Sequence, residues 1–513
     1  MSTGARTNWS NRALPWAVGI ASLLCRIPYM IRYDLHFGGD FAVAYLMAKR
    51  ILLGEFPIFF WEQNYQGAVN QYLTAPFFAI FGPSIPLACF VTALLWAVTI
   101  GLTVSYVQRG WGMRPALLAG IALCVGVPQL HHYDTQPIAS GYSLGMLFPV
   151  VFLWLAVLTV ERGWTVGLCI AWGGVMGLGL YTSRQLLFSV LTVGLVMLSL
   201  PAGRQRLREF LKVRPVLFFL VAGFIGFFPE LLHTHNPNSP PPPANGFASP
   251  SLLLENFYFL MRTIPAYFDG DPLARLPEGV FYLFHNENVE SFPRSAADMV
   301  GIIAAIITVH YVIKNFRKAW IEKNMPVLLL AGFPLVNAGL VLVSAASGGN
   351  YYNLRRYIVT SSLILLAWLG IKISNCLEKK RYLTASVLVL MLGLSAYHQV
   401  QNFSEPDQLA DYRKLVAELD ARGIRVAASV YSHSYVLTAL SNEKLIVAPL
   451  DYKAYPKYLE AVAQAEVWAW IQPAQAPLAI PERMRLFNAT YVRQGESKQI
   501  GFLQYVVYKH STL

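Results

Sequence analysis

The sequence predicts an α-helical membrane protein with many spans and a small α/β domain at its C-terminal end. The chain of 513 residues is 55% hydrophobic and 13% charged, with a mean hydropathy of +0.44, whereas about 25% of the residues of a soluble protein are charged. The apolar residues gather in runs of membrane-spanning length, and charged residues are evenly interspersed only after residue 400. This composition excludes a soluble globular protein.

The apolar runs predict about eleven crossings, because each crossing needs roughly 20 apolar residues. The third and fifth runs are shorter than the others, and the turn YTSRQ at 181–185 either joins two spans or lies inside a re-entrant pair. The predicted spans are residues 13–31, 84–106, 115–130, 142–160, 164–181, 185–201, 215–232, 298–314, 327–345, 357–374 and 382–399.

The distribution of basic residues predicts which loops are cytoplasmic. Lys and Arg (40) outnumber Asp and Glu (28), but most of the excess lies in alternate short loops, which indicates membrane orientation and not nucleic-acid binding. The N-terminus is then cytoplasmic, and no cleavage pattern follows residues 1–12, so we expect the first span to remain as an anchor. The segments expected outside are 32–83, 128–141, 182–184, 233–297, 346–356 and everything after 400.

Residues 1–399 are therefore expected to form the membrane domain and residues 400–513 an external domain. In the latter, LADYRKLVAELDARG predicts an amphipathic helix that ends at Gly423, and runs such as RVAASVY and FLQYVVYKH predict strands. We assign Tyr431 and His433 in YSHSY to packing. The five cysteines have no CxxC spacing and are expected to be packing residues too.

The first external loop carries the most informative motif. DFAVAYLMAKRILLG predicts an amphipathic helix in the membrane interface, and Asp40 stands at its start after Gly38 and Gly39, where the helix dipole favours an anion. Two readings are open: Asp40 is a helix N-cap, or it is a functional carboxylate at the water–lipid boundary.

Other polar residues are candidates for metal or phosphate binding, and each also has an ordinary structural explanation. His131, His132 and Asp134 in HHYDTQP offer zinc-ligand types or form a polar loop. Arg184, and Arg355 with Arg356, suit phosphate binding, because a guanidinium binds phosphate oxygens with two donors; their alternative role is snorkelling at helix ends. A further arginine, Arg26, lies inside the first span and should face the bundle.

The order of motifs resembles the first external loop of the GT-C glycosyltransferases, which include protein O-mannosyltransferases and lipid A aminoarabinose transferases. The motifs are GGD at 38–40, LLGEFP at 52–57, YQG at 65–67 and TAPFFAIFG at 74–82; ARGIRVAASVYSHSYVLTALSNEKLIVAP resembles the external domain of bacterial members. The resemblance implies an integral membrane enzyme of the bacterial inner membrane, with a periplasmic C-terminal domain.

The resemblance also implies the reaction and its residues. A sugar would pass from a polyprenyl-phosphate donor to a lipid, glycan or protein acceptor, with inversion, and Asp40 would be the catalytic base. Arg356, with Arg355 and Arg184, would contact the donor phosphate. Further acidic or acceptor contacts would come from the second and first external loops, at Asp134, Glu62, His131 and Tyr65.

Two departures from the family pattern bear on activity and on metal use. Phe41 follows Asp40 where many relatives have a second acid, and Asn70 stands where others have Glu. Without that second carboxylate no ligand set for a metal is defined, so no cofactor is assigned and metal use stays open. A transporter or flippase for a lipid-linked glycan, or a non-catalytic relative that binds the carrier, is the alternative to the enzyme.

Overall fold

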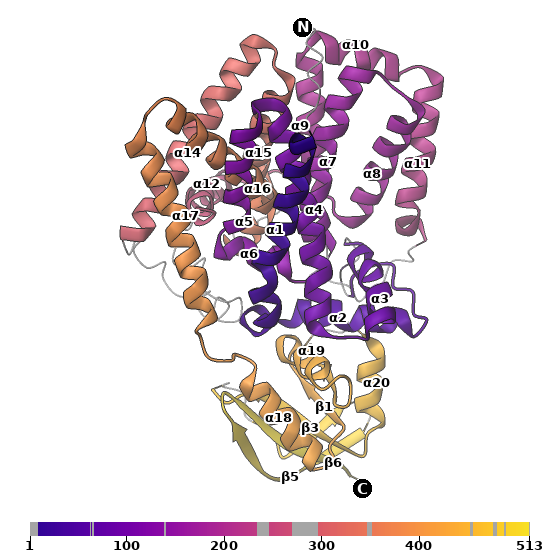
Figure 1. Cartoon of the computed structure of the whole chain (residues 1–513). Helices are drawn as coiled ribbons and strands as arrows, with labels where there is room; N and C mark the ends of the chain where they lie inside the picture. Colours follow the sequence, from indigo (N-terminus) through magenta and orange to yellow (C-terminus); the bar gives the residue numbers. More distant parts are fainter. Residues whose placement is uncertain are drawn as a thin grey trace.

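A computed structural model describes most of the chain as a helical bundle with a small α/β domain at one end (Figure 1). The first described helix, α1 (Trp9–Ile31), begins at the end of the bundle that carries α10 (Pro201–Phe210), and the last strand, β6 (Leu503–His510), lies in the small domain at the opposite end. The described residues are 9–61, 63, 66–137, 140–232, 246–268, 296–345, 351–451, 455–475, 480–486 and 489–511.

All eleven segments predicted to be spans are helices. By length and apolarity eight described helices can cross a membrane, or nine if α9 and α10, which meet at a bend of 113°, count as one span; α5 and α8 are shorter apolar helices. Their bounds are α1 (Trp9–Ile31), α4 (Ile85–Trp111), α5 (Met113–Val125), α7 (Ser140–Arg162), α8 (Val166–Thr182), α9 (Leu186–Ser199), α11 (Val213–Leu231), α14 (Ala296–Glu322), α15 (Met325–Val343), α16 (Tyr351–Glu378) and α17 (Tyr382–Phe403).

Small residues bring the spans into close contact. A side chain on Gly173 or Gly177 of α8 would overlap the backbone of α11 at Phe219 or Gly223, and one on Gly370 of α16 would overlap the backbone of α5. Helices in a membrane gain little from apolar burial, so such close backbone approach is a main source of their association.

The loops that the sequence placed outside contain helices of their own. Segment 32–83 holds η1 (Tyr33–His36), α2 (Gly39–Leu52) and α3 (Val69–Phe81), and segment 128–141 opens with α6 (Pro128–Thr135). Segment 233–297 also holds a helix, α12 (Pro250–Ala266), which packs against α14, α15 and α16. Helix α12 has 17 residues and carries Glu255 and Arg262, so it lacks the apolar run by which the spans were recognised.

Helix α2 lies across the end of the bundle, as Figure 1 shows, but it is not amphipathic over most of its length. Every residue from Phe41 to Ala48 is buried, because α3 packs on one side and α19 (Tyr431–Leu440) of the C-terminal domain on another. The expectation of one lipid-facing side is therefore wrong for this segment.

The C-terminal domain is the α/β domain that the sequence predicts. Its sheet has the order β2-β1-β3-β6-β5-β4; β1 is parallel to β2 and β3, through crossovers over α19 and α20, and the other pairs are antiparallel. The bounds are α18 (Ala410–Ala421), β1 (Val426–Ser429), β2 (Ile446–Pro449), α20 (Pro456–Gln464), β3 (Val467–Pro473), β4 (Arg483–Leu486), β5 (Ala489–Ile500) and β6 (Leu503–His510).

Two features of α18 and α17 refine the predicted boundaries. Helix α18 ends as expected: Gly423 has φ +72°, a left-handed conformation that glycine adopts without strain at a helix end. Helix α17 continues past residue 399 to Phe403, and the connection that follows is tied to the bundle. There Arg32 donates to the carbonyl oxygens of Phe403 and, at 2.9 Å, Glu405.

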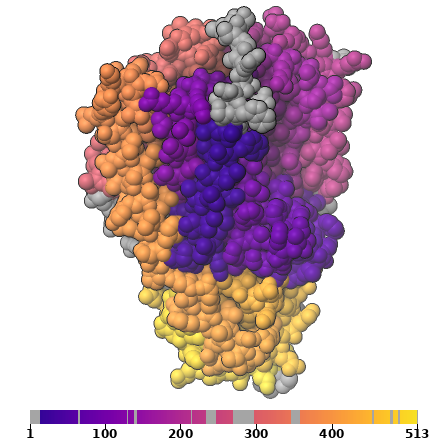
Figure 2. All heavy atoms as spheres, viewed as in Figure 1, coloured from indigo at the N-terminus to yellow at the C-terminus, as the bar shows by residue number. Residues whose placement is uncertain are grey.

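The space-filling view shows the C-terminal domain seated directly against the segments that follow α1 (Figure 2). Helix α10, in a loop predicted to be cytoplasmic, lies at the far end of the bundle (Figure 1). The start of α1 and the C-terminal domain therefore lie at opposite ends of the bundle.

Candidate functional site

Asp40 lies in the first turn of α2, at the boundary between the bundle and the C-terminal domain. The N-cap is Gly38, which makes no side-chain cap bond, so the N-cap reading of Asp40 is wrong. Its Oδ1 accepts a 2.7 Å hydrogen bond from the Tyr431 hydroxyl, and its Oδ2 has no hydrogen bond within the described part of the chain. A partly exposed carboxylate at a helix N-terminus thus keeps one oxygen for a ligand.

Tyr431 reaches Asp40 because glycine precedes the carboxylate. A Cβ atom on Gly39 would lie 3.0 Å from Cε1 of the Tyr431 ring, which is closer than ordinary packing allows. The tyrosine is held from its own side as well, since its backbone N–H donates to Asp451 at 2.8 Å. Gly39 of the GGD motif therefore allows the C-terminal domain to pack closely against α2, in addition to permitting a tight turn.

A cluster of charged and aromatic side chains fixes the C-terminal domain on the first loop. Glu443 accepts from Lys49 Nζ at 2.8 Å and from Tyr458 Oη at 2.8 Å, and it also pairs with Arg50. The ring of Trp61 stacks on that of Tyr455, with centroids 4.2 Å apart.

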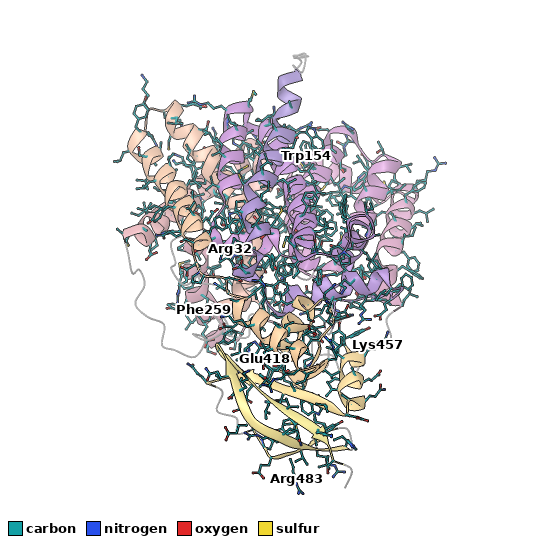
Figure 3. The ribbon with its side chains drawn as sticks, turned by 60° about the horizontal axis from the view of Figure 1, so that its bottom comes forward. Arg32, Trp154, Phe259, Glu418, Lys457 and Arg483 are labelled. Carbon is teal, nitrogen blue, oxygen red and sulfur yellow. The ribbon has the colours of Figure 1, made fainter. Side chains whose placement is uncertain are left out.

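A second acid on the first loop extends these contacts. Glu55 accepts from Tyr455 Oη at 2.6 Å and from Lys457 Nζ at 2.7 Å. Figure 3 shows Lys457 on the side of the C-terminal domain that faces the bundle. The two domains thus meet through ion pairs at several points along the first loop.

The ion pairs of Glu443 make domain docking sensitive to acid. Burial raises the pKa of Glu443. The hydrogen bonds from Lys49 and Tyr458 and the charge of Arg50 lower this pKa by more than burial raises it, so it lies below its ordinary value of 4.5. When docking lowers the pKa of a carboxyl group, that group stabilises the docked state at pH values above its ordinary pKa. This contribution is lost as the pH falls through the lowered pKa.

We therefore expect Glu443→Gln to lower the thermal unfolding midpoint at neutral pH, and the difference from the wild type to shrink as the pH falls below about 4.5. Protonated Glu443 and glutamine are alike in charge, which is why the two proteins should converge. The measurement is the unfolding midpoint of both proteins across this range. A difference that stays constant with pH would contradict the assignment.

The YQG motif and the YTSRQ turn lie against one another. Gly67 N–H donates to the Tyr181 carbonyl at 2.9 Å, and the Tyr181 hydroxyl donates to the carbonyl of Ile58. Within the turn, Arg184 lies 3.8 Å from Glu230 and is 55% exposed. The turn therefore carries an accessible guanidinium on the side of the bundle that holds the first loop.

Gly67 is expected to tolerate no side chain. A Cβ atom there would lie 2.7 Å from the Tyr181 ring and 2.8 Å from its carbonyl oxygen, so Gly67→Ala should displace the loop and destabilise the protein by about 1–3 kcal/mol. The thermal unfolding midpoint measures this. Gly145→Ala is the control, since a methyl group there meets no atom within 4 Å; equal midpoints for the two variants would show that the loop adapts.

Asp134 and His131 are not loop residues open to water. Both are buried and lie on α6, where Asp134 Oδ2 accepts from Arg26 Nε at 3.1 Å and Nη2 at 2.9 Å and lies 3.0 Å from His131 Nδ1. The prediction of a polar loop here is wrong, because the segment is helical and both side chains are buried, where Asp134 is the partner that the arginine of the first span needs. Arg26 faces the bundle, as expected.

Several sequence candidates fall outside the described part of the chain. Glu62 and Tyr65 are among the residues left undescribed, as is the side chain of His132. Arg355 and Arg356 lie in α16, but the structure does not describe their side chains. Their roles remain predictions.

The two positions that depart from the family pattern are both buried. Phe41 packs against Phe37 with ring centroids 4.7 Å apart, and Asn70 lies buried in α3. A carboxylate in place of Phe41 would therefore sit among aromatic rings. Among the described residues, no group of three or more His, Cys, Asp or Glu side chains is arranged to hold a metal ion.

Tyr431 is the site residue that sequence reasoning missed. YSHSY was assigned to packing, and this suits His433, whose ring nitrogen lies 2.7 Å from the Tyr412 hydroxyl inside the C-terminal domain. No local signal separates Tyr431 from its neighbours, because its partner is 391 residues away in the chain.

Comparison with known proteins identifies the fold. No protein-family model matches the chain, and no curated protein matches its sequence. Among solved structures, ArnT from Cupriavidus metallidurans in the apo state matches with a TM-score of 0.57 at 12% identity, covering 96% of this chain and 97% of that one. The same protein bound to undecaprenyl phosphate matches with a TM-score of 0.55 at 11% identity, covering 98% of both chains.

An oligosaccharyltransferase from Archaeoglobus fulgidus, in complex with zinc and sulfate, also matches, with a TM-score of 0.49 at 12% identity over 88% of this chain and 67% of that one. ArnT is a lipid A aminoarabinose transferase with the GT-C fold. The likeness to ArnT runs the full length of both chains. The protein is thus an integral membrane protein with the GT-C fold, as its motifs predicted.

Proposed function

We propose that this protein is an inverting glycosyltransferase that moves a sugar from a polyprenyl-phosphate donor to an acceptor on the outer face of the membrane. The observation that carries the proposal is Asp40: a partly exposed carboxylate with one oxygen engaged and one left open, at the domain boundary of a full-length GT-C fold. That ArnT has been solved with undecaprenyl phosphate supports the class of donor.

The reaction needs one base and a means of neutralising a phosphate. An acceptor hydroxyl or amine attacks the anomeric carbon, the bond from that carbon to the phosphate oxygen breaks, and the phosphate leaves with the electron pair. The acceptor proton passes to Asp40. A phosphate leaves without a strong acid, so the proposal assigns no metal and asks only for cations near the leaving group.

Arginines are proposed for the leaving phosphate. Arg184 is exposed next to the first loop, with Glu230 3.8 Å away, and Arg355 and Arg356 lie in the first two turns of α16. A guanidinium stays charged and binds phosphate oxygens through paired donors. Glu62 and Tyr65 remain candidates for acceptor contacts, whereas Asp134 and His131 are withdrawn, because they belong to a buried ion pair.

The proposal includes a location. The positive-inside pattern puts α10 and the N-terminus in the cytoplasm, and the C-terminal domain at the opposite end would then face the periplasm of a bacterial inner membrane. The donor carries its sugar on a membrane lipid, so a site at the membrane edge can be reached by the donor from the bilayer and by a polar acceptor from water.

The test is transfer of a radiolabelled sugar in proteoliposomes that contain the purified wild-type protein and a panel of polyprenyl-phosphate sugars, with an extract of bacterial envelope lipids and glycans as acceptor. Labelled product together with released polyprenyl phosphate is the expected result. Movement of the donor across the bilayer without any transfer would establish a flippase, and donor binding with neither activity would establish a non-catalytic relative.

A further inference from the structure

The C-terminal domain contributes a side chain to the proposed catalytic group. The Tyr431 hydroxyl donates to Asp40 Oδ1 at 2.7 Å, in a partly buried contact. Both residues lie in the first turns of regular helices, Asp40 in α2 and Tyr431 in α19. Because side chains on helices are placed more precisely than side chains on loops, the two groups meet with a defined geometry.

The two helices are joined at two points. Asp40 meets Tyr431 at the start of both helices, and Lys49 meets Asn442 at 2.6 Å and Glu443 at 2.8 Å beyond the end of α19. The two points on α2 are nine residues apart, or roughly 13 Å along the helix axis. A slide of either helix would break both contacts at once.

Three contacts hold the Tyr431 side chain in its place. Gly39 leaves the space that the ring occupies, Asp451 accepts from the Tyr431 backbone N–H, and Tyr435 packs edge-on against the ring with centroids 5.4 Å apart. The Tyr431 hydroxyl is therefore held within hydrogen-bond distance of Asp40 Oδ1, and this hydrogen bond restricts rotation of the carboxylate.

We propose that Tyr431 is a positioning residue for Asp40, so that the C-terminal domain completes the site for sugar transfer. The proposal rests on the proposed role of Asp40 as base. Tyr431 donates to Oδ1 throughout the reaction and keeps its proton, while Oδ2 is turned toward the acceptor and receives the proton of the attacking group. A base held within hydrogen-bond reach of the acceptor is what general base catalysis requires.

Tyr431→Phe tests this, because it removes only the hydroxyl. We expect kcat for sugar transfer to fall by about 10- to 100-fold, the range for loss of a hydrogen bond to a charged group, with KM for the donor unchanged. The control is Tyr412→Phe, which removes a hydroxyl of the same domain whose contact with His433 is also 2.7 Å long but lies away from Asp40; its kcat should match the wild type.

A second readout needs no transfer. Asp40 is labelled with a water-soluble carbodiimide and an amine in the purified full-length protein, and the label is quantified by mass spectrometry. Labelling should rise several-fold in Tyr431→Phe and not in Tyr412→Phe, because only the first variant releases Oδ1.

The outcomes separate the two proposals. If the wild type transfers sugar and Tyr431→Phe has the same kcat, or if both proteins are labelled equally at Asp40, the positioning role is overturned. If the wild type transfers from no donor, the proposed function fails, and the labelling experiment alone decides whether Tyr431 holds Asp40.

Discussion

Replacement of Asp40 by asparagine is expected to lower sugar transfer by about 10²- to 10⁴-fold, the range that a general base contributes. Asparagine has nearly the same shape and can still accept the hydrogen bond from Tyr431, so the C-terminal domain should stay docked. Only the ability to take the acceptor proton is removed. The measurement is the initial rate of transfer in proteoliposomes, together with binding of the labelled donor, which should persist.

The control for this substitution is Asp420→Asn. Asp420 is an exposed acid of the C-terminal domain that pairs with Arg425, so its loss changes the net charge by the same amount without touching the site. Transfer by Asp40→Asn at the rate of this control would show that Asp40 is structural, and the base would then have to be sought at Glu62.

Loss of Asp134 is expected to destabilise the bundle strongly. Asp134 and Arg26 are both 0% exposed. The five N–H groups of Arg26 all donate hydrogen bonds, to Asp134 and to the carbonyl oxygens of Ser22, Leu123 and Cys124. Asp134→Asn would leave the guanidinium charge buried without a counter-ion, at a cost of about 3–5 kcal/mol.

The measurement is the midpoint of heat-induced loss of monodisperse protein in detergent. The double variant Arg26→Met with Asp134→Leu should recover most of the lost stability, because a buried ion pair can often be replaced by apolar side chains of similar volume. Glu161→Gln is the matched control, since the pair of Glu161 with Arg109 is 41% and 42% exposed and such surface pairs contribute about 0–1 kcal/mol. Equal midpoints for Asp134→Asn and this control would contradict the assignment.

The pair of Arg26 and Asp134 was only partly predictable from the sequence. The cost of a charge in lipid was enough to predict that Arg26 faces the bundle, but not its partner, which is 108 residues away. His131 and Asp134 fall three residues apart on one short helix and so lie on the same side of it. Read as an external loop, the same residues looked like polar groups open to solvent.

Residue patterns were enough to predict the eleven helical segments, the position of the C-terminal domain at the end of the bundle opposite α10, the α/β character of that domain, and the place of Asp40 at the start of a helix. These follow from local causes: the length of apolar runs, the distribution of lysine and arginine, and the residues that begin and end helices.

Three features depend on how the chain folds in space: α2 is covered by α3 and α19, Arg26 neutralises Asp134, and Tyr431 donates to Asp40. Each of these joins segments that periodicity treats as independent, because a hydrophobic pattern states which side of a helix is buried and not what buries it. Asp40 and Tyr431 are 391 residues apart in the chain and meet because the C-terminal domain packs against the first loop. No residue pattern near either position indicates this contact.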